Sequence, residues 1–239
     1  MRVKEYLSVR GIEFQSINVL ADESGMATLR ALGARSVPVV ARDGQFVYAQ
    51  VIKDVVDFLG LNDATGPVLS PLELGERADL MIATTTRLVR QMPDAALERE
   101  LPNRPRSWRV LMHHVFQIHN AFLDMEETGA TFSYENLVAE PPDAFRTSAA
   151  IASFGESVHA RYRGWWARAQ HESFAAMVPT YFGPTSRHEM LERTVWHSAQ
   201  HARQVAALLE QAGVTPDRPL SADDLRGLPL TDRIWDEAG

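Results

Sequence analysis

The stretch TSRHEMLERTVWHSAQHARQVAALLEQAG, residues 185–213, decides how the second part of this chain folds. Ser186 and Glu189 have the spacing of a capping box, which predicts the start of a helix. His197 and His201 are four residues apart, so their imidazoles lie on one helix face about one turn from each other. They belong to a seam with steps of three and four: Met190, Thr194, His197, His201, Gln204 and Leu208.

A second stretch, LMHHVFQIHNAFL at residues 111–123, supplies a third histidine. His114 lies on the apolar stripe of this stretch, where both ring nitrogens need partners. His113 is the alternative candidate for the third ligand and lies about 100° around the helix. Three imidazoles from facing helices can bind one divalent metal and leave a position open. Such ligands suit Zn, Ni, Cu or Fe. A surface pair, or hydrogen-bonded core histidines, is the competing interpretation.

Helical periodicity and proline spacing predict the organisation of this part. Prolines separate the candidate helices, and a Gly- and Pro-containing linker at 61–70 precedes them. Four long helices with moderate loops predict a four-helix bundle over 71–215. The Pro- and Asp-containing tail, 216–239, is expected to pack on the bundle through Leu228, Leu230, Ile234 and Trp235. The predicted helices are 71–92, 107–128, 144–170 and 185–212.

Residues 1–60 differ, because apolar β-branched runs alternate with helical patterns, which predicts an α/β segment. The expected order is α-β-α-β-β-α, with a tight turn at Asp43-Gly44. The predicted helices are 2–10, 23–33 and 51–60. The predicted strands are 12–20, 36–42 and 45–50.

Composition excludes several classes of function. The chain of 239 residues has no cysteine, which excludes disulfides, thiolate metal sites and a cysteine nucleophile. The net charge of −7 falls entirely outside residues 1–60, so a nucleic-acid partner is not expected. No apolar run approaches the roughly 18 residues of a membrane span, and the N-terminus lacks a signal-peptide pattern. We therefore expect a cytoplasmic protein with no membrane partner.

The two histidine-bearing stretches resemble the second and last helices of the DinB-like (damage-inducible) superfamily. His114, His197 and His201 match the three metal ligands, and Gln204 matches a Gln three residues after the last. The resemblance covers about residues 71–215. It implies a four-helix bundle with a three-His divalent-metal site. Members with known activities are mostly S-transferases or isomerases that use low-molecular-weight thiols.

Residues 1–60 resemble a glutaredoxin, through EYLSVRGIEF (5–14), LRALGARSVPVV (29–40) and DGQFVYAQVIKDVVDFLG (43–60). The resemblance implies a cis Val37-Pro38 bond whose exposed backbone pairs with a thiol peptide. The C-x-x-C motif and the first βα unit of the thioredoxin fold are absent. We expect either that the gene starts upstream of Met1, or that this incomplete domain is rearranged or completed by a partner chain.

Three functional hypotheses follow. The first is a metal-dependent thiol transferase or isomerase acting on a small electrophile, with Gln204 supporting the ligands and Val37 and Pro38 binding the thiol. The second is a non-catalytic metal- or thiol-binding regulatory module, and the third is a scaffold. A homodimer is an open alternative, because bundles of this kind often pair. Trp108, Trp196 and Tyr181 are candidate pocket walls, with core packing as the competing interpretation.

Overall fold

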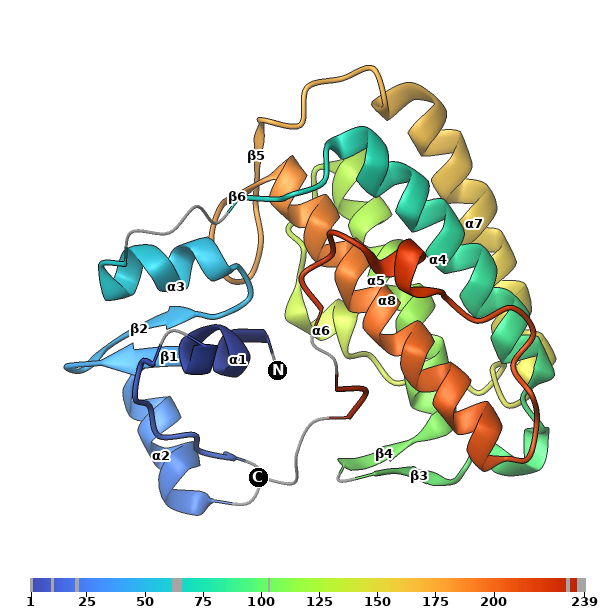
Figure 1. The fold of residues 1–239 in the computed structure, drawn as a ribbon, viewed down its shortest axis with the longest axis horizontal. Coiled ribbons are helices and arrows are strands. Elements are labelled where there is room, and N and C mark those ends of the chain that lie inside the picture. Colours follow the sequence, from blue (N-terminus) through green and yellow to red (C-terminus); the bar gives the residue numbers. More distant parts are fainter. Residues whose placement is uncertain are drawn as a thin grey trace. The chain divides into compact units, whose positions relative to one another are not determined.

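The computed structural model of the chain describes residues 2–9, 11–19, 22–61, 66–102, 104–230 and 233–235 (Figure 1). The chain divides into two compact units. One comprises residues 1–66 with 231–239, and the other comprises residues 67–230.

The N-terminal unit contains three helices and a β-hairpin. Its apolar cluster joins the first helix to the third, where the fully buried Val55 lies. Asp43 and Gly44 both have positive φ angles, 54° and 76°, as a two-residue hairpin turn requires. The elements are α1 (Arg2–Val9), α2 (Glu23–Ala31), β1 (Val39–Arg42), β2 (Gln45–Tyr48) and α3 (Ile52–Leu59).

The strand expected over 12–20 is wrong for residues 12–19, which form no strand. Strand β1 pairs only with β2 within the described part of the chain. A strand needs a hydrogen-bonded neighbour, and alternation of side chains cannot provide one. Phe14 and Ile17, which supplied part of the apolar pattern, are exposed. Position 20 lies outside the described residues.

The second unit contains the four predicted long helices, α4 (Pro71–Gln91), α5 (Trp108–Thr128), α7 (Ser148–Ala169) and α8 (Arg187–Gln211). Both α4 and α5 pack against α7 and against α8, which makes a bundle (Figure 1). Capping boxes begin α4 at Ser70 and α8 at Ser186. The bounds agree with the predicted ones to within two residues, except that the helix expected from residue 144 begins at Ser148, after its N-cap Thr147.

Two glycines let the helices approach closely. A methyl group at Gly75 of α4 would lie 2.0 Å from Trp166 of α7, and one at Gly155 of α7 would lie 2.6 Å from Phe116. Both distances are too short for a real Cβ. The rings of Trp166 and Phe116 therefore occupy the space that a side chain would fill at Gly75 and Gly155. The bundle core is therefore tight, and α5, its central histidine-bearing helix, is buried along most of its length.

Short elements connect the helices. Part of the chain after α8 lies along α4, where Arg87 donates to the carbonyl oxygens of Asp217 and Arg218. Leu228 in this segment is buried, whereas Ile234 and Trp235 belong to the N-terminal unit. The connecting elements are η1 (Asp94–Ala96), β3 (Glu100–Leu101), β4 (Arg104–Ser107), α6 (Tyr134–Leu137), β5 (Met177–Val178), β6 (Thr185–Ser186) and α9 (Ala222–Leu225).

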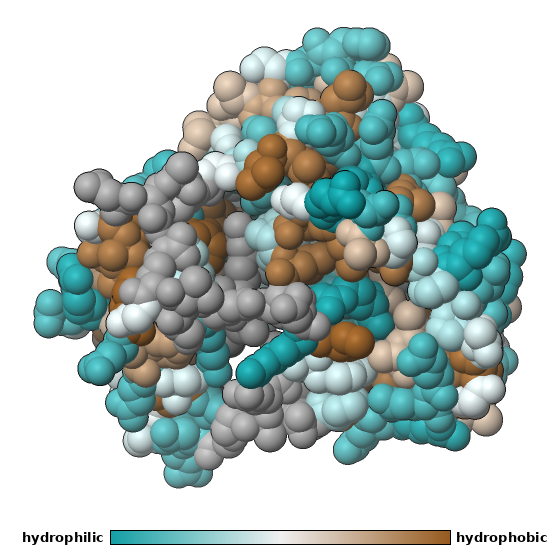
Figure 2. All heavy atoms as spheres, in the orientation of Figure 1, coloured by the Kyte–Doolittle hydropathy of each residue, from teal (hydrophilic) through white to brown (hydrophobic). Residues whose placement is uncertain are grey.

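Hydrophilic side chains cover much of the visible surface of the helical unit, with apolar side chains between them (Figure 2). Within the described residues, none of the helices combines the length and apolar character that crossing a membrane would need.

Candidate metal centre

Three histidines from two helices meet inside the bundle. His114 projects from α5, and His197 and His201 project from α8, which packs directly against α5. One ligand nitrogen from each ring lies within 4.8 Å of the others. The ring centroid of His114 lies 5.4 Å from that of His197 and 5.1 Å from that of His201. The sequence pattern therefore identified side chains that are neighbours in space.

The spacing suits a metal ion. Metal–nitrogen bonds of about 2.0–2.1 Å at tetrahedral angles put ligand nitrogens about 3.3 Å apart. Small side-chain rotations would bring these rings to that separation. His114 and His201 are buried and His197 is half-buried, which leaves one side of the cluster nearer to solvent. These three residues could hold a metal ion with a position open to a further ligand.

The proton on His114 is fixed by the protein backbone. Its Nδ1 lies 2.9 Å from the carbonyl oxygen of Leu137. A carbonyl oxygen only accepts hydrogen bonds, so Nδ1 carries the proton and donates. Nε2 of His114 then keeps its lone pair, which is the form that ligates metals.

His201 is oriented in the same way by a side chain. Its Nδ1 donates to Oε1 of Gln204, 2.7 Å away on the next turn of α8. The lone pair of His201 is therefore on Nε2. Gln204, expected to support the metal ligands, thus contacts one of the three histidines.

His197 shows independently whether this cluster suits a metal ion. Its Nδ1 is buried and has no hydrogen-bond partner among the residues that the structure describes. An imidazole nitrogen buried without a partner is unfavourable in a static core. Coordination of an ion is one chemistry that satisfies a ring nitrogen in this cluster, so the residues present fit a metal.

Electrostatics favours neutral imidazoles. Burial, followed by the electrostatic interaction with His201, lowers the pKa of His114 well below 6.5. The same two causes, with the charge of Arg193 third, lower the pKa of His197 well below 6.5. Neutral imidazole is the form that binds metals, so both rings are in that form at neutral pH.

His113, the rival of His114, lies outside the cluster. Its ring stacks on Phe154 with centroids 5.1 Å apart and 14° between the planes, and a second ring, Phe145, is also 5.1 Å away. Burial lowers the pKa of His113 to about 4. It is a neutral member of an aromatic core.

Two further histidines have structural partners rather than surface positions. Nε2 of His159 lies 2.7 Å from Oδ1 of Asp79, which also pairs with Arg163. Nε2 of His188 lies 2.8 Å from the carbonyl oxygen of Leu69. Both are half-buried, because loop and helix contacts outside their own helix cover them.

A buried Ser–His pair lies close to the cluster but has the wrong direction for catalysis. Nε2 of His119 is 2.9 Å from Oγ of Ser198. That hydroxyl donates to the carbonyl oxygen of Val195 at 3.0 Å. It therefore accepts from His119, which cannot act as its base in this arrangement.

The aromatic wall candidates have different surroundings. Trp108 is buried and its Nε1 donates to the carbonyl oxygen of Glu100, so it is a core residue. The ring of Trp196 lies 5.5 Å from that of His197. The hydroxyl of Tyr181 accepts a hydrogen bond from Arg193, which lies one turn before His197. Sequence reasoning missed Arg193 and the Leu137 carbonyl.

In the N-terminal unit, the Val37-Pro38 peptide bond is cis, as expected. Val37 is 41% exposed, and its carbonyl oxygen accepts from Nε2 of Gln50 at 3.4 Å. These two residues thus lie at an accessible position, immediately before β1.

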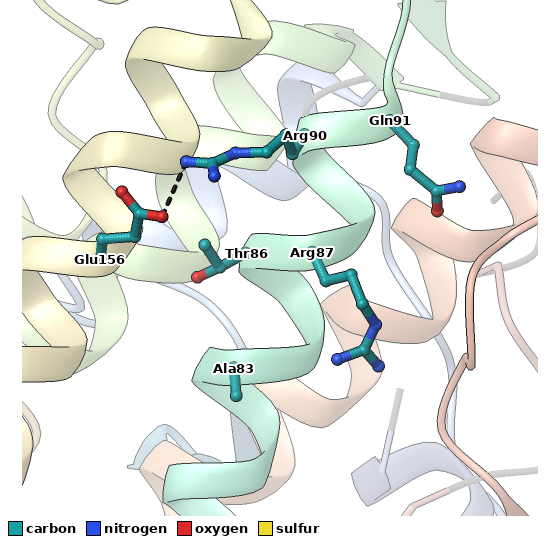
Figure 3. Close-up of a pocket in the computed structure, with 6 residues that line it drawn as sticks. All are labelled: Ala83, Thr86, Arg87, Arg90, Gln91 and Glu156. Atoms are coloured by element: carbon teal, nitrogen blue, oxygen red, sulfur yellow. Dashed lines mark hydrogen bonds and ion pairs between the residues drawn. The ribbon is translucent and has the colours of Figure 1, made fainter.

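A separate hollow of about 380 Å³ lies on the bundle surface and contains none of the three histidines (Figure 3). Arg90 pairs with Glu156 across it at 2.7 Å. Arg87 holds backbone carbonyl oxygens of the segment that follows α8. These arginines have structural partners, so the hollow adds no group to the metal centre. Its lining residues are Ala83, Thr86, Arg87, Arg90, Gln91 and Glu156.

Comparison with known proteins supports the nature of the N-terminal part. A family model described as glutaredoxin matches residues 1–47. The matched region includes the cis proline and ends within β2. No curated protein matches the chain.

Proposed function

We propose that the helical unit is a DinB-like divalent-metal centre and that the protein is a thiol-dependent S-transferase or isomerase. The substrates are a low-molecular-weight thiol and a small electrophile. One observation carries this proposal: three imidazole nitrogens from α5 and α8 lie within 4.8 Å of one another. The resemblance of the two histidine-bearing stretches to the DinB-like superfamily supplies the reaction class.

The roles of the residues follow from their contacts. His114, His197 and His201 would hold the ion, and the Leu137 carbonyl and Gln204 keep protons on the outer nitrogens of two of these rings. A bound divalent ion would supply positive charge that lowers the pKa of a thiol beside it. The half-buried position of His197 provides the side from which small molecules reach the site.

The N-terminal unit supports the choice of a thiol as one substrate. A glutaredoxin model matches this part, and the cis Val37-Pro38 bond lies at an exposed position. We assign Val37 and Pro38 to thiol binding. Because the chain has no cysteine, the thiol must come from solution.

A second candidate function is a non-catalytic module that binds a metal or a thiol and regulates a partner. The lack of any cysteine in a glutaredoxin-like segment favours it, because dithiol chemistry is impossible with this chain alone. It shares the metal centre with the first candidate and differs only in turnover.

A conjugation assay separates the two. Protein loaded with Zn, Ni or Fe is incubated with glutathione, cysteine or another low-molecular-weight thiol and an electrophile such as 1-chloro-2,4-dinitrobenzene. Enzyme function predicts product formation that is lost in His197→Ala/His201→Ala and retained in His171→Ala, a change at an exposed histidine. Binding of metal and thiol without turnover over a broad panel of electrophiles would favour the regulatory module.

A further inference from the structure

Arg193 places a positive charge beside the three histidines. It precedes His197 by four residues on α8, so the two side chains lie on the same helix face, about 6 Å apart along the axis. Arg193 is only 3% exposed. A buried guanidinium is unusual, because removing this charge from water costs free energy.

An aromatic cage holds the guanidinium in place. Its Cζ lies 5.3 Å from the ring centroid of Phe132 and 5.4 Å from that of Phe182. Its Nη2 donates to the hydroxyl of Tyr181 at 3.4 Å. Phe132 and Tyr181 are themselves joined by a backbone hydrogen bond of 3.0 Å. The cation–π contacts and this fixed loop keep the charge near the cluster.

The positive charge of Arg193 acts on the histidine cluster. The i, i+4 spacing on α8 and the burial of the guanidinium place its charge beside the ring of His197, where little water screens it. Arg106, a half-buried residue of β4, also interacts electrostatically with His114 and His197. Two separate elements therefore add positive potential at the place where a metal would bind.

We propose that the metal held by His114, His197 and His201 takes an anionic fourth ligand in preference to a neutral one, and that Arg193 is the positioning residue for this selectivity. The inference rests on the proposed metal centre. A fixed cation repels a dication and attracts an anion on it, so Arg193 weakens metal binding and strengthens anion binding. The ligand class this selects is a small anion such as a thiolate or a carboxylate.

The opposite signs of these two effects provide the test. The full chain is loaded with Co²⁺, and the dissociation constants of Co²⁺, azide and imidazole are measured by visible absorption. Azide is the anionic probe and imidazole is the neutral one. Arg193→Met should tighten Co²⁺ binding about 10-fold and weaken azide about 10-fold, with imidazole changed less than about two-fold.

Matched variants separate charge from packing. Arg193→Lys, which keeps the charge, should restore the azide preference, and Arg168→Met, at an exposed site on α7, should change no constant. Arg106→Gln repeats the test without altering the aromatic cage. A purely structural role for Arg193 would weaken Co²⁺ and azide binding together.

Three outcomes are informative. Tighter Co²⁺ and weaker azide in Arg193→Met or Arg106→Gln supports the inference. An unchanged azide-to-imidazole ratio in both variants overturns it and leaves the metal centre intact. Failure of the wild-type chain to bind Co²⁺ or any of Zn, Ni and Fe overturns the proposed function as well.

Discussion

Nδ1 of His114 lies 2.9 Å from the carbonyl oxygen of Leu137, so a backbone group in α6 fixes which nitrogen of a core histidine can bind metal. The short helix α6 is held against α5, with Leu137 buried on it. This contact orients the ring of His114 and leaves its lone pair on Nε2.

Loosening α6 is expected to weaken metal binding. Leu137→Ala removes the buried side chain that holds the carbonyl in place, and loss of such outer contacts costs about 10- to 100-fold in metal affinity. Competition with a chelator measures the change. Leu72→Ala, at an exposed leucine of α4, is the control and should leave the affinity unchanged. Equal affinities in the two variants would contradict the orienting role.

Gln204 should contribute to metal affinity by a similar factor. Gln204→Leu removes the acceptor for Nδ1 of His201, and we expect metal affinity to fall about 10- to 100-fold. Gln204→Glu keeps an acceptor and should retain the affinity, since a carboxylate also accepts from Nδ1. The same chelator competition distinguishes the variants. Identical loss in Leu and Glu variants would show that the amide packs rather than accepts.

The metal-free protein should lose stability in mild acid. Burial lowers the pKa of His113 to about 4, whereas the unfolded imidazole titrates near 6.5. Between about pH 6.5 and pH 4 the unfolded state therefore binds a proton at His113 and the folded state does not. The free energy of unfolding falls as the pH drops through this range. The slope is about 1.4 kcal/mol per pH unit for each such histidine.

Urea unfolding of the metal-free chain between pH 7 and 4.5 measures this dependence. His113→Gln should reduce the slope by about one proton, because glutamine does not titrate. His171→Gln, at an exposed position, should leave the slope as it is in the wild type. A His113→Gln slope equal to the wild-type slope would mean that His113 is protonated in the folded protein.

The helix contact at Gly75 makes a prediction about stability alone. Gly75→Ala would place Cβ 2.0 Å from Trp166, and such overpacking costs about 1–3 kcal/mol. Gly164→Ala, where nothing lies within 4 Å of the added methyl, should stabilise α7 by about 0.5–1 kcal/mol. Thermal unfolding measures both changes. Destabilisation of similar size in both variants would contradict the close approach of α4 and α7.

The sequence was sufficient for features that are local. Prolines, caps and a 3.6-residue period define α4, α5, α7 and α8, and the i, i+4 spacing of His197 and His201 places them on one face. It was insufficient where partners are distant in the chain. The segment 12–19 has a strand pattern but forms no strand, because no described strand pairs with it.

Two groups that contact or neighbour the histidines, the Leu137 carbonyl and Arg193, were not predicted from the sequence. The Leu137 carbonyl belongs to the backbone, so no side-chain pattern could reveal it. Arg193 has the same spacing to His197 as His197 has to His201, and that signal was available. An arginine on a helix is normally a surface residue, which is why its burial needed the structure.

Metal content is the most direct measurement of the central claim. Elemental analysis of untagged protein, after refolding with Zn, Ni, Mn or Fe, should give about one divalent ion per chain, because one cluster of three imidazoles lies within bonding reach among the described residues. The ion should be lost in His197→Ala/His201→Ala and retained in His171→Ala. An ion-free wild-type protein under all these conditions, or an ion retained in the double variant, would contradict the account.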